Sequence, residues 1–322
     1  MIIGNMKRNI YSYSKLWMIS FVLMGAACTN QVEDAIPVSG QPIEFSVQSD
    51  WKEIPNTRSN PGKPHFKDSD TIQIFGFHTS SSGDVKKFMY RVGEPARGQK
   101  VVFDSISNKW NYSPKRFWPK EGKLDFYAGY PHYSVLNDKT NHNKMTYEQP
   151  DFNPLGVDLL WGLATNRDCA TVPKKIVEIW MVHALAKVRI ILDSSLGEIG
   201  TVKVSGYKAG HFEYTIDGVP VWKIDDKTPI DATFHKFGDK GDKVDEELLN
   251  ENSVTVFILP KKITGLQMWD YGSHLIDASE KIKDLEFEAG KVYNLTISKS
   301  NGVRKKNTNS RSIAMSVRCV SE

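Results

Sequence analysis

The chain has 322 residues, of which 42 are lysine or arginine and 38 are aspartate or glutamate, so its formal net charge is +4. Three of the basic residues lie in residues 1–27, which contain no acid, and without that segment the charges stand at 39 against 38. This balance excludes the broad basic surface that nucleic-acid binding needs. The remaining length, with 40% hydrophobic content, exceeds a usual single domain, so we expect two domains with real cores.

The first 27 residues predict an export signal. Lys7, Arg8 and Lys15 precede residues 16–27, an apolar or near-apolar run that is too short to span a bilayer as a helix. The run ends at Cys28, and polar residues follow at once. Cleavage just before Cys28 would make it the mature N-terminus, where its thiol could carry lipid.

This N-terminal pattern resembles a bacterial lipoprotein signal, with one departure. Gly25 occupies the position where such signals usually carry Leu, Val or Ile, and Leu23 stands two residues earlier. The alternative is an ordinary secretory signal, which would leave Cys28 as a plain thiol. In either case Met6 could equally be the true start. On this pattern we expect lipidation of Cys28. Several acyl chains, worth about 0.8 kcal/mol for each buried methylene, would then anchor the protein stably.

Residues 28–40 are small and polar, as in a tether between an anchor and a folded body. Beyond them a period of two dominates. Ile43, Phe45 and Val47 share one face while polar residues take the other, which is typical of a half-buried strand. The other strands expected in the first half are 71–77, 86–92, 100–103, 123–130, 176–181 and 186–192.

The second half continues the same pattern after a break at residues 196–200. The strands expected there are 201–207, 211–216, 252–260, 284–290 and 291–298. The region between Asp225 and Asn252 is charged, and its residues 239–250 predict a long loop or a single short helix.

Many short strands separated by turn residues predict an all-β protein of two β-sandwich domains in tandem. We place the N-terminal sandwich at residues 41–195, the C-terminal sandwich at 196–299 and a basic tail at 300–322. After Cys28 only Cys169 and Cys319 remain, and an oxidising compartment could pair them. The sequence does not show whether these two cysteines meet.

Three stretches carry a resemblance to a known family. They are RFWPKEGKLDFYAGYPHY (116–133), VDLLWGLATN (157–166) and MVHALAKVRIIL (181–192). Together with IEFSV (43–47), NTR (56–58), DTIQIFGF (70–77) and FEAGKVYNLTIS (287–298), they resemble in order and spacing the fimbrillin family, the FimA/Mfa-type pilins of Bacteroides-like bacteria. The resemblance covers residues 41–298 and the lipoprotein signal.

The resemblance implies two transthyretin-like β-sandwiches and a role as a fimbrial subunit or cell-surface adhesin component. Family members are exported to the outer membrane as lipoproteins, and an arginine-specific protease removes the anchor together with the first strand. In this sequence the removable strand corresponds to Ile43, Phe45 and Val47, and the arginine to Arg58. A sandwich that loses an edge strand exposes apolar side chains and unpaired backbone groups, which form a template for an incoming strand.

The tail departs from a simple pilin ending. Residues 299–311 are basic and polar, and Ile313, Met315 and Val317 then alternate on one face. A detached strand with a flexible lead is what a donor strand needs. The alternative, which we favour, is a last strand packed on the chain's own C-terminal domain; a tip subunit could lack a donor altogether.

The sequence shows no convergent catalytic or metal-binding pattern. The eight histidines never fall at ligand spacing, and His183, between two expected strands, is expected to be a hydrogen-bonded structural side chain. Nucleophile-elbow, P-loop and dinucleotide-binding patterns do not occur. The acids rejected on spacing are Asp239, Asp242 and Asp245 for calcium, and Glu121, Asp125 and Asp158 for glycoside hydrolysis.

Five aromatic residues cluster in sequence: Trp110, Tyr112, Phe117, Trp118 and Tyr127. Sugar-binding surfaces often use such rings, but a tryptophan beside a proline more often fills the end of a sandwich core. We therefore expect these rings to be core residues.

The sequence thus predicts an exported outer-membrane lipoprotein that is a structural or accessory subunit of a cell-surface fimbria, with no enzyme activity, metal or cofactor. Its expected partners are other fimbrial subunits, an arginine-specific protease, the outer membrane through lipid, and a host protein or glycan. The alternative is a permanently anchored surface lipoprotein that binds glycan or a host ligand without polymerising. An enzyme would need a cleft with perturbed carboxylates or a metal.

Overall fold

The computed structural model describes residues 36, 38–49, 66–138, 144–151, 155–170, 176–214, 220–235, 249–250, 252–299, 302–307 and 317–318. The chain divides into two units, residues 1–38 and 39–322, and almost all of the described residues belong to the second. Several predicted features lie outside the described residues: the export signal, Cys28, Arg58, the loop acids Asp239, Asp242 and Asp245, and Ile313, Met315 and Cys319.

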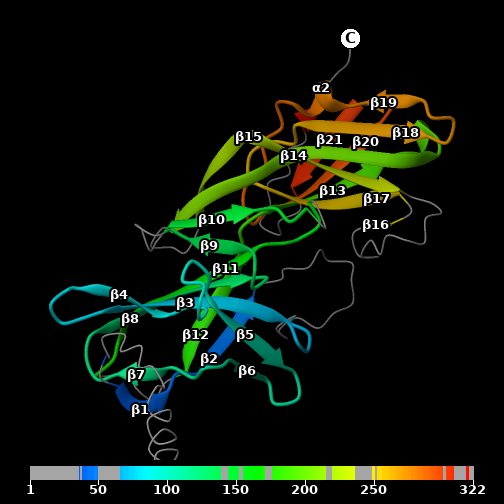
Figure 1. The fold of residues 1–322 in the computed structure, drawn as a ribbon. Coiled ribbons are helices and arrows are strands. Elements are labelled where there is room, and N and C mark those ends of the chain that lie inside the picture. The colour runs from blue at the N-terminus through cyan, green and yellow to red at the C-terminus, as the bar shows by residue number, and fades with distance from the viewer. Residues whose placement is uncertain are drawn as a thin grey trace, which may run out of the picture. The chain divides into compact units, whose positions relative to one another are not determined.

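The described residues are almost entirely strands and turns (Figure 1), which confirms the predicted all-β class. An eight-stranded sheet runs in the order β2 (Phe45–Ser49), β12 (Val177–His183), β11 (Leu160–Asp168), β8 (Lys123–Tyr130), β3 (Thr71–Thr79), β5 (Gln99–Asp104) and β6 (Lys109–Asn111), and β4 (Val85–Met89) pairs with β3. A two-stranded sheet joins β1 (Val38–Pro42) to β7 (Phe117–Pro119).

Two six-stranded sheets complete the described fold. The β14 sheet runs in the order β19 (Leu275–Asp277), β18 (Gly265–Asp270), β14 (Ile199–Tyr214), β10 (Lys144–Glu148) and β9 (Val135–Asn137), with β15 (Pro220–His235) paired to β14. The β13 sheet runs in the order β16 (Leu249–Asn250), β17 (Ser253–Ile258), β13 (Ala186–Leu192), β20 (Val292–Ser298), β21 (Gly302–Asn307) and β22 (Val317–Arg318). The short helices are η2 (Ser194–Leu196) and α2 (Ser279–Ile282).

The β13 and β14 sheets bury one core between them. Val188 and Ile190 alternate inward along β13, and Val202 and Val204 do so along β14, all four within a single cluster of buried side chains. Period-two alternation of this kind places every second side chain on the same face of a sheet. The two sheets therefore form a β-sandwich.

A second core lies against the eight-stranded sheet. Phe75 of β3 and Trp161 of β11 share a buried cluster with Met145 of β10 and Phe212 of β14. The rings of Trp161 and Phe212 meet edge to face, with centroids 5.1 Å apart. The second half of β14 therefore packs on the eight-stranded sheet, while its first half packs on the β13 sheet.

Strand β14 differs from the prediction of two strands. It is continuous from Ile199 to Tyr214, with a register shift against β15 between Tyr207 and Ala209. Its first half pairs with β18 and its second half with β10. A bulge lets one long strand change direction without a turn. Strand β14 therefore pairs with β10, which precedes the predicted boundary at 195/196, as well as with β18, which follows it. That boundary remains a prediction.

One other segment also differs from the sequence prediction: residues 285–288 have no regular structure where a strand was expected. No strand was predicted for residues 225–235, which belong to strand β15 and pair with β14. Strand β21, within residues 299–311 of the tail, pairs with β20 of the same chain, which agrees with the favoured alternative of a tail packed on its own C-terminal domain.

Central strand β13 should dominate the stability of the sandwich. Ile190 is fully buried between the two sheets. We expect Ile190→Ala to lower the free energy of unfolding by about 2–5 kcal/mol and Ile190→Val by about 0.5–1.5 kcal/mol, because each removed methylene loses burial and leaves a cavity. Urea unfolding of the two variants measures this, and equal losses would contradict the packing described.

Candidate functional site

The first strand of the eight-stranded sheet has one buried face. Ile43, Phe45 and Val47 are buried, whereas Glu44 and Gln48, on the other face, are exposed and Ser46 is half-buried. The predicted alternation of the three apolar residues is therefore confirmed. Because successive side chains of a strand point to opposite faces, one face of this segment lies in the core and the other lies in solvent.

Strand β2 stands at the end of its sheet (Figure 1). Its only hydrogen-bonded strand among the described residues is β12, which runs parallel to it, with Phe45 opposite Val177 and Ser49 opposite Met181. The two residues just before β2 are each held by one backbone hydrogen bond. Ile43 N donates to Arg116 O at 2.9 Å, and Val177 N donates to Glu44 O at 2.8 Å.

An aromatic pocket receives the apolar face of β2. The Phe45 ring meets the rings of Tyr112 and Phe126 edge to face, with centroids 5.7 and 5.3 Å away. Trp118 packs behind Phe126 at 6.4 Å. These rings come from β7, β8 and the segment after β6, so most of the pocket belongs to parts of the chain that follow β2.

The Tyr112 hydroxyl ties the pocket to the backbone of the edge segment. It donates to Ile43 O at 2.8 Å, and burial raises the pKa of Tyr112 to about 12. This hydrogen bond could not be predicted from the sequence, because a backbone carbonyl acceptor leaves no residue pattern and the two residues are 69 positions apart.

The aromatic cluster identified in the sequence is largely core. Trp110, Tyr112, Trp118 and Tyr127 are buried, whereas Phe117 is 37% exposed. The core interpretation is confirmed for four of the five rings.

The half-buried His183 meets the buried Asp158 at the end of β12. His183 Nδ1 lies 2.6 Å from Asp158 Oδ2, which confirms that this histidine is hydrogen-bonded; its structural role stays a prediction. Asp125 accepts a hydrogen bond from the Asn166 backbone at 2.6 Å. The described residues contain no group of three or more His, Cys, Asp or Glu side chains that could hold a metal ion.

The candidate cysteine pair and the candidate donor strand each lie only partly within the described residues. Cys169 is buried with a free thiol, and burial raises its pKa to about 11. Its suggested partner Cys319 lies outside the described residues, so their pairing stays a prediction. Val317 of the candidate donor strand lies in β22, which pairs with β21 of the same chain.

The sequence profile of the fimbrillin-like family matches residues 57–314. The chain belongs to the fimbrillin-like family. No curated protein sequence matches it. The described part of this fimbrillin-like chain has no helix long and apolar enough to cross a membrane.

Solved structures share this fold. A candidate cell adhesion protein from Bacteroides ovatus superposes with a TM-score of 0.52 at 13% identity, covering 88% of this chain and 99% of that one. A second, from Bacteroides uniformis, gives 0.51 at 17% identity, covering 83% and 96%. At these identities the likeness concerns the fold alone.

The two faces of β2 should respond differently to truncation. We expect Phe45→Ala to lower the free energy of unfolding by about 3–5 kcal/mol, because it empties the pocket between Tyr112 and Phe126. Gln48→Ala, on the exposed face of the same strand, should change it by less than about 0.5 kcal/mol. Urea unfolding measures both, and similar losses would show that the strand is not seated as described.

The stability contributed by the Tyr112 hydrogen bond should be lost at alkaline pH. Its pKa is raised from 10.0 to about 12 in the folded chain, so the stability it contributes is fully present below pH 10 and is lost as pH rises toward 12. Tyr112→Phe should lower the free energy of unfolding by about 0.5–1.5 kcal/mol at pH 8. The difference between the two proteins should shrink in urea titrations between pH 10 and pH 12, and a constant difference would contradict the assignment.

Proposed function

We propose that the chain is a structural or accessory subunit of a cell-surface fimbria, mediating adhesion, and that it assembles by strand exchange after proteolytic removal of its first strand. The observation that carries this proposal is the position of β2, whose apolar face is buried although it ends its sheet. Family membership supports a fimbrial or adhesin role.

The proposed exchange follows from what β2 covers. Release of residues up to Arg58 would take away Ile43, Phe45 and Val47 and leave the pocket lined by Tyr112 and Phe126 open to water. It would also unpair the backbone of β12 along Val177–Met181. A buried apolar side chain contributes about 1.5–3 kcal/mol, and an unpaired strand edge attracts another strand. A strand of a second subunit would therefore bind in the vacated slot.

The segment between β2 and the next described strand suits a cleavage site by its position. Arg58 lies between Ser49, where β2 ends, and Phe66, where the described chain resumes. The family match begins at residue 57, after β2. A cut at Arg58 would separate the first strand from the matched part of the chain.

The lipid anchor belongs to the same proposal. We propose that Cys28 carries lipid, that residues 1–27 are a signal peptide and that the lipid holds the precursor at the outer membrane until an arginine-specific protease acts. The chain is proposed to have no catalytic activity.

The test uses residues 29–322 and an arginine-specific protease. We expect a cut after Arg58, loss of the first strand and then ladders of oligomers on unheated gels, whereas Arg58→Lys should stay uncut and form no ladder. An excess of a peptide with the sequence of residues 41–49 should refill the slot and shorten the ladders.

Two outcomes would contradict the proposal. A cut chain that remains monomeric would contradict assembly by strand exchange. A protease-resistant monomer that binds glycan or a host protein would support a permanently anchored surface lipoprotein instead.

A further inference from the structure

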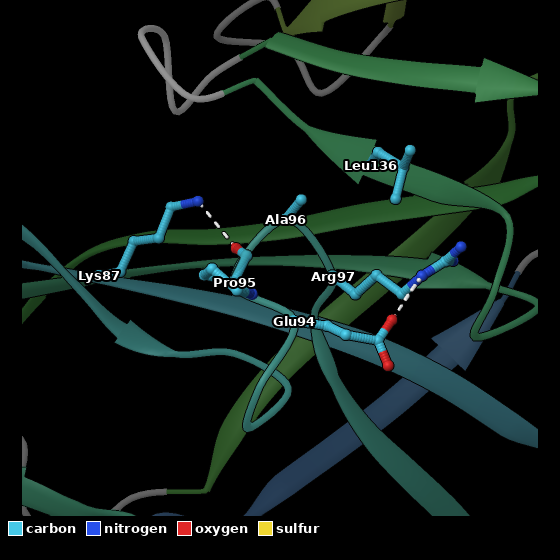
Figure 2. Close-up of a pocket in the computed structure, with 6 residues that line it drawn as sticks. All are labelled: Lys87, Glu94, Pro95, Ala96, Arg97 and Leu136. Carbon is cyan, nitrogen blue, oxygen red and sulfur yellow. Dashed lines mark hydrogen bonds and ion pairs between the residues drawn. The ribbon is translucent and has the colours of Figure 1, made fainter.

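We propose that the turn at residues 105–108 of one copy of this chain docks, through Ile106, into a surface hollow on a second copy. The hollow is lined by Lys87, by residues 94–97 and by Leu136 (Figure 2). The inference deepens the proposed subunit role and rests on it, but it uses surfaces other than the β2 slot.

The turn presents a single apolar side chain to solvent. Ile106 is 97% exposed, and it lies between strands β5 and β6. Scattered exposed hydrophobic residues are normal in proteins, so exposure alone does not mark a contact. The backbone that carries Ile106 adds a second observation.

Two carboxylates fix that backbone. Asp104 accepts from Ile106 N at 2.9 Å and from the Ser107 hydroxyl at 2.7 Å. Asp68 accepts from Ser105 N at 3.0 Å and from its hydroxyl at 3.1 Å. These hydrogen bonds lower the pKa of both carboxyls, so the turn is held at neutral pH. A preformed loop loses little conformational entropy when it binds.

The hollow is large enough for this turn and has an apolar floor. Its volume is about 480 Å³, whereas a cavity of about 150 Å³ already holds benzene. Pro95, Ala96 and Leu136 supply the aliphatic surface, and Leu136 is 39% exposed. A branched aliphatic side chain and the turn that carries it therefore fit the space.

The frame of the hollow is also held in place. Lys87 Nζ donates to Pro95 O at 2.8 Å, and Arg97 Nε lies 3.1 Å from Glu94 Oε2 (Figure 2). Asn137 N donates to Ala96 O at 2.9 Å, which joins the 94–97 loop to β9. Both partners of the proposed contact are thus formed before they meet.

The charges around the two surfaces have opposite signs. Near the hollow, the four cations Lys87, Arg91, Arg97 and Lys100 outnumber the two carboxylates, Glu94 and Asp138. The last three of these cations lie close enough to His132 to lower its pKa, after the larger effect of burial. Near the turn, three carboxylates stand against two ammonium groups: they are Asp68, Asp70 and Asp104 against Lys67 and Lys109. Complementary potentials favour this pairing over turn against turn or hollow against hollow.

The placement of the two surfaces makes the contact open-ended. The 94–97 loop precedes strand β5 and the 105–108 turn follows it, so they lie at opposite ends of one extended strand. A contact between different patches of identical chains is heterologous, and unless its rotation closes a ring it propagates as a filament. The second copy that fills the hollow therefore leaves its own hollow open for a third.

Sedimentation velocity of the uncleaved Arg58→Lys chain tests this contact, because that variant cannot exchange strands after arginine-specific cleavage. We expect concentration-dependent association that is weakened roughly 30-fold by Ile106→Ser and by Leu136→Trp, which fills the hollow. Leu275→Ser removes another half-exposed aliphatic side chain, on β19, and should leave association unchanged.

A mixture of the two variants gives the sharper result. The Ile106→Ser chain keeps its hollow and the Leu136→Trp chain keeps its turn, so an equimolar mixture should form dimers and nothing larger. A chain that stays monomeric up to about 1 mM, association that neither substitution weakens, or an acidic oligosaccharide that fills the hollow of a monomeric chain would overturn the proposal. Each of these results would leave strand exchange through the β2 slot unaffected.

Discussion

The seating of Phe45 between Tyr112 and Phe126 is the interaction on which the proposed assembly depends. It combines strong side-chain burial with a weak backbone attachment, because β2 has one hydrogen-bonded strand neighbour among the described residues. Side-chain burial is specific to residue size and spacing, whereas the backbone groups of β12 are indifferent to sequence. Any strand with the same alternation could therefore replace β2, and a strand with another pattern would lose the burial term of about 1.5–3 kcal/mol for each apolar residue.

The direction of β2 adds a second constraint. β2 runs parallel to β12, and Phe45 and Val47 stand opposite Val177 and Ile179. A slip of one residue would turn the apolar residues of an incoming strand to the solvent face. In the proposed exchange the slot would thus select an incoming strand for register as well as for composition. The Tyr112 hydroxyl donates a hydrogen bond to the backbone carbonyl of Ile43, just before the strand. This bond favours the same register whatever side chain stands at that position.

The sequence predicted the elements whose alternation is bounded by turn residues. Residues 123–130 and 186–192 form β8 and β13 with the predicted bounds, and the buried stripe of β2 was found from three residues. The sequence prediction missed strands where solvent exposure or unusual length hides the alternation of apolar and polar residues. The charged residues 225–235, for which no strand was predicted, form part of an edge strand that shows one face to water, and β14 continues through a bulge where two strands were predicted. Tyr112 was recognised as a core ring, but its bond to Ile43 depends on a contact across 69 positions that no local pattern encodes.

The edges of the described sheets are not equivalent as templates for an added strand. β15 is a 16-residue strand that pairs with β14 alone among the described strands, yet Pro220 and Pro229 lack backbone donors and Asp225 turns its carboxylate back onto Lys227 N at 3.0 Å. Prolines, charges and irregular register are the features that keep an edge from pairing with another chain. The edge of β12 carries no proline between Val177 and His183 and is covered by β2. One edge is therefore protected by its own sequence and the other by strand β2. Under the proposed cleavage of the following segment, β2 would leave, and pairing between copies would be directed to the slot beside β12.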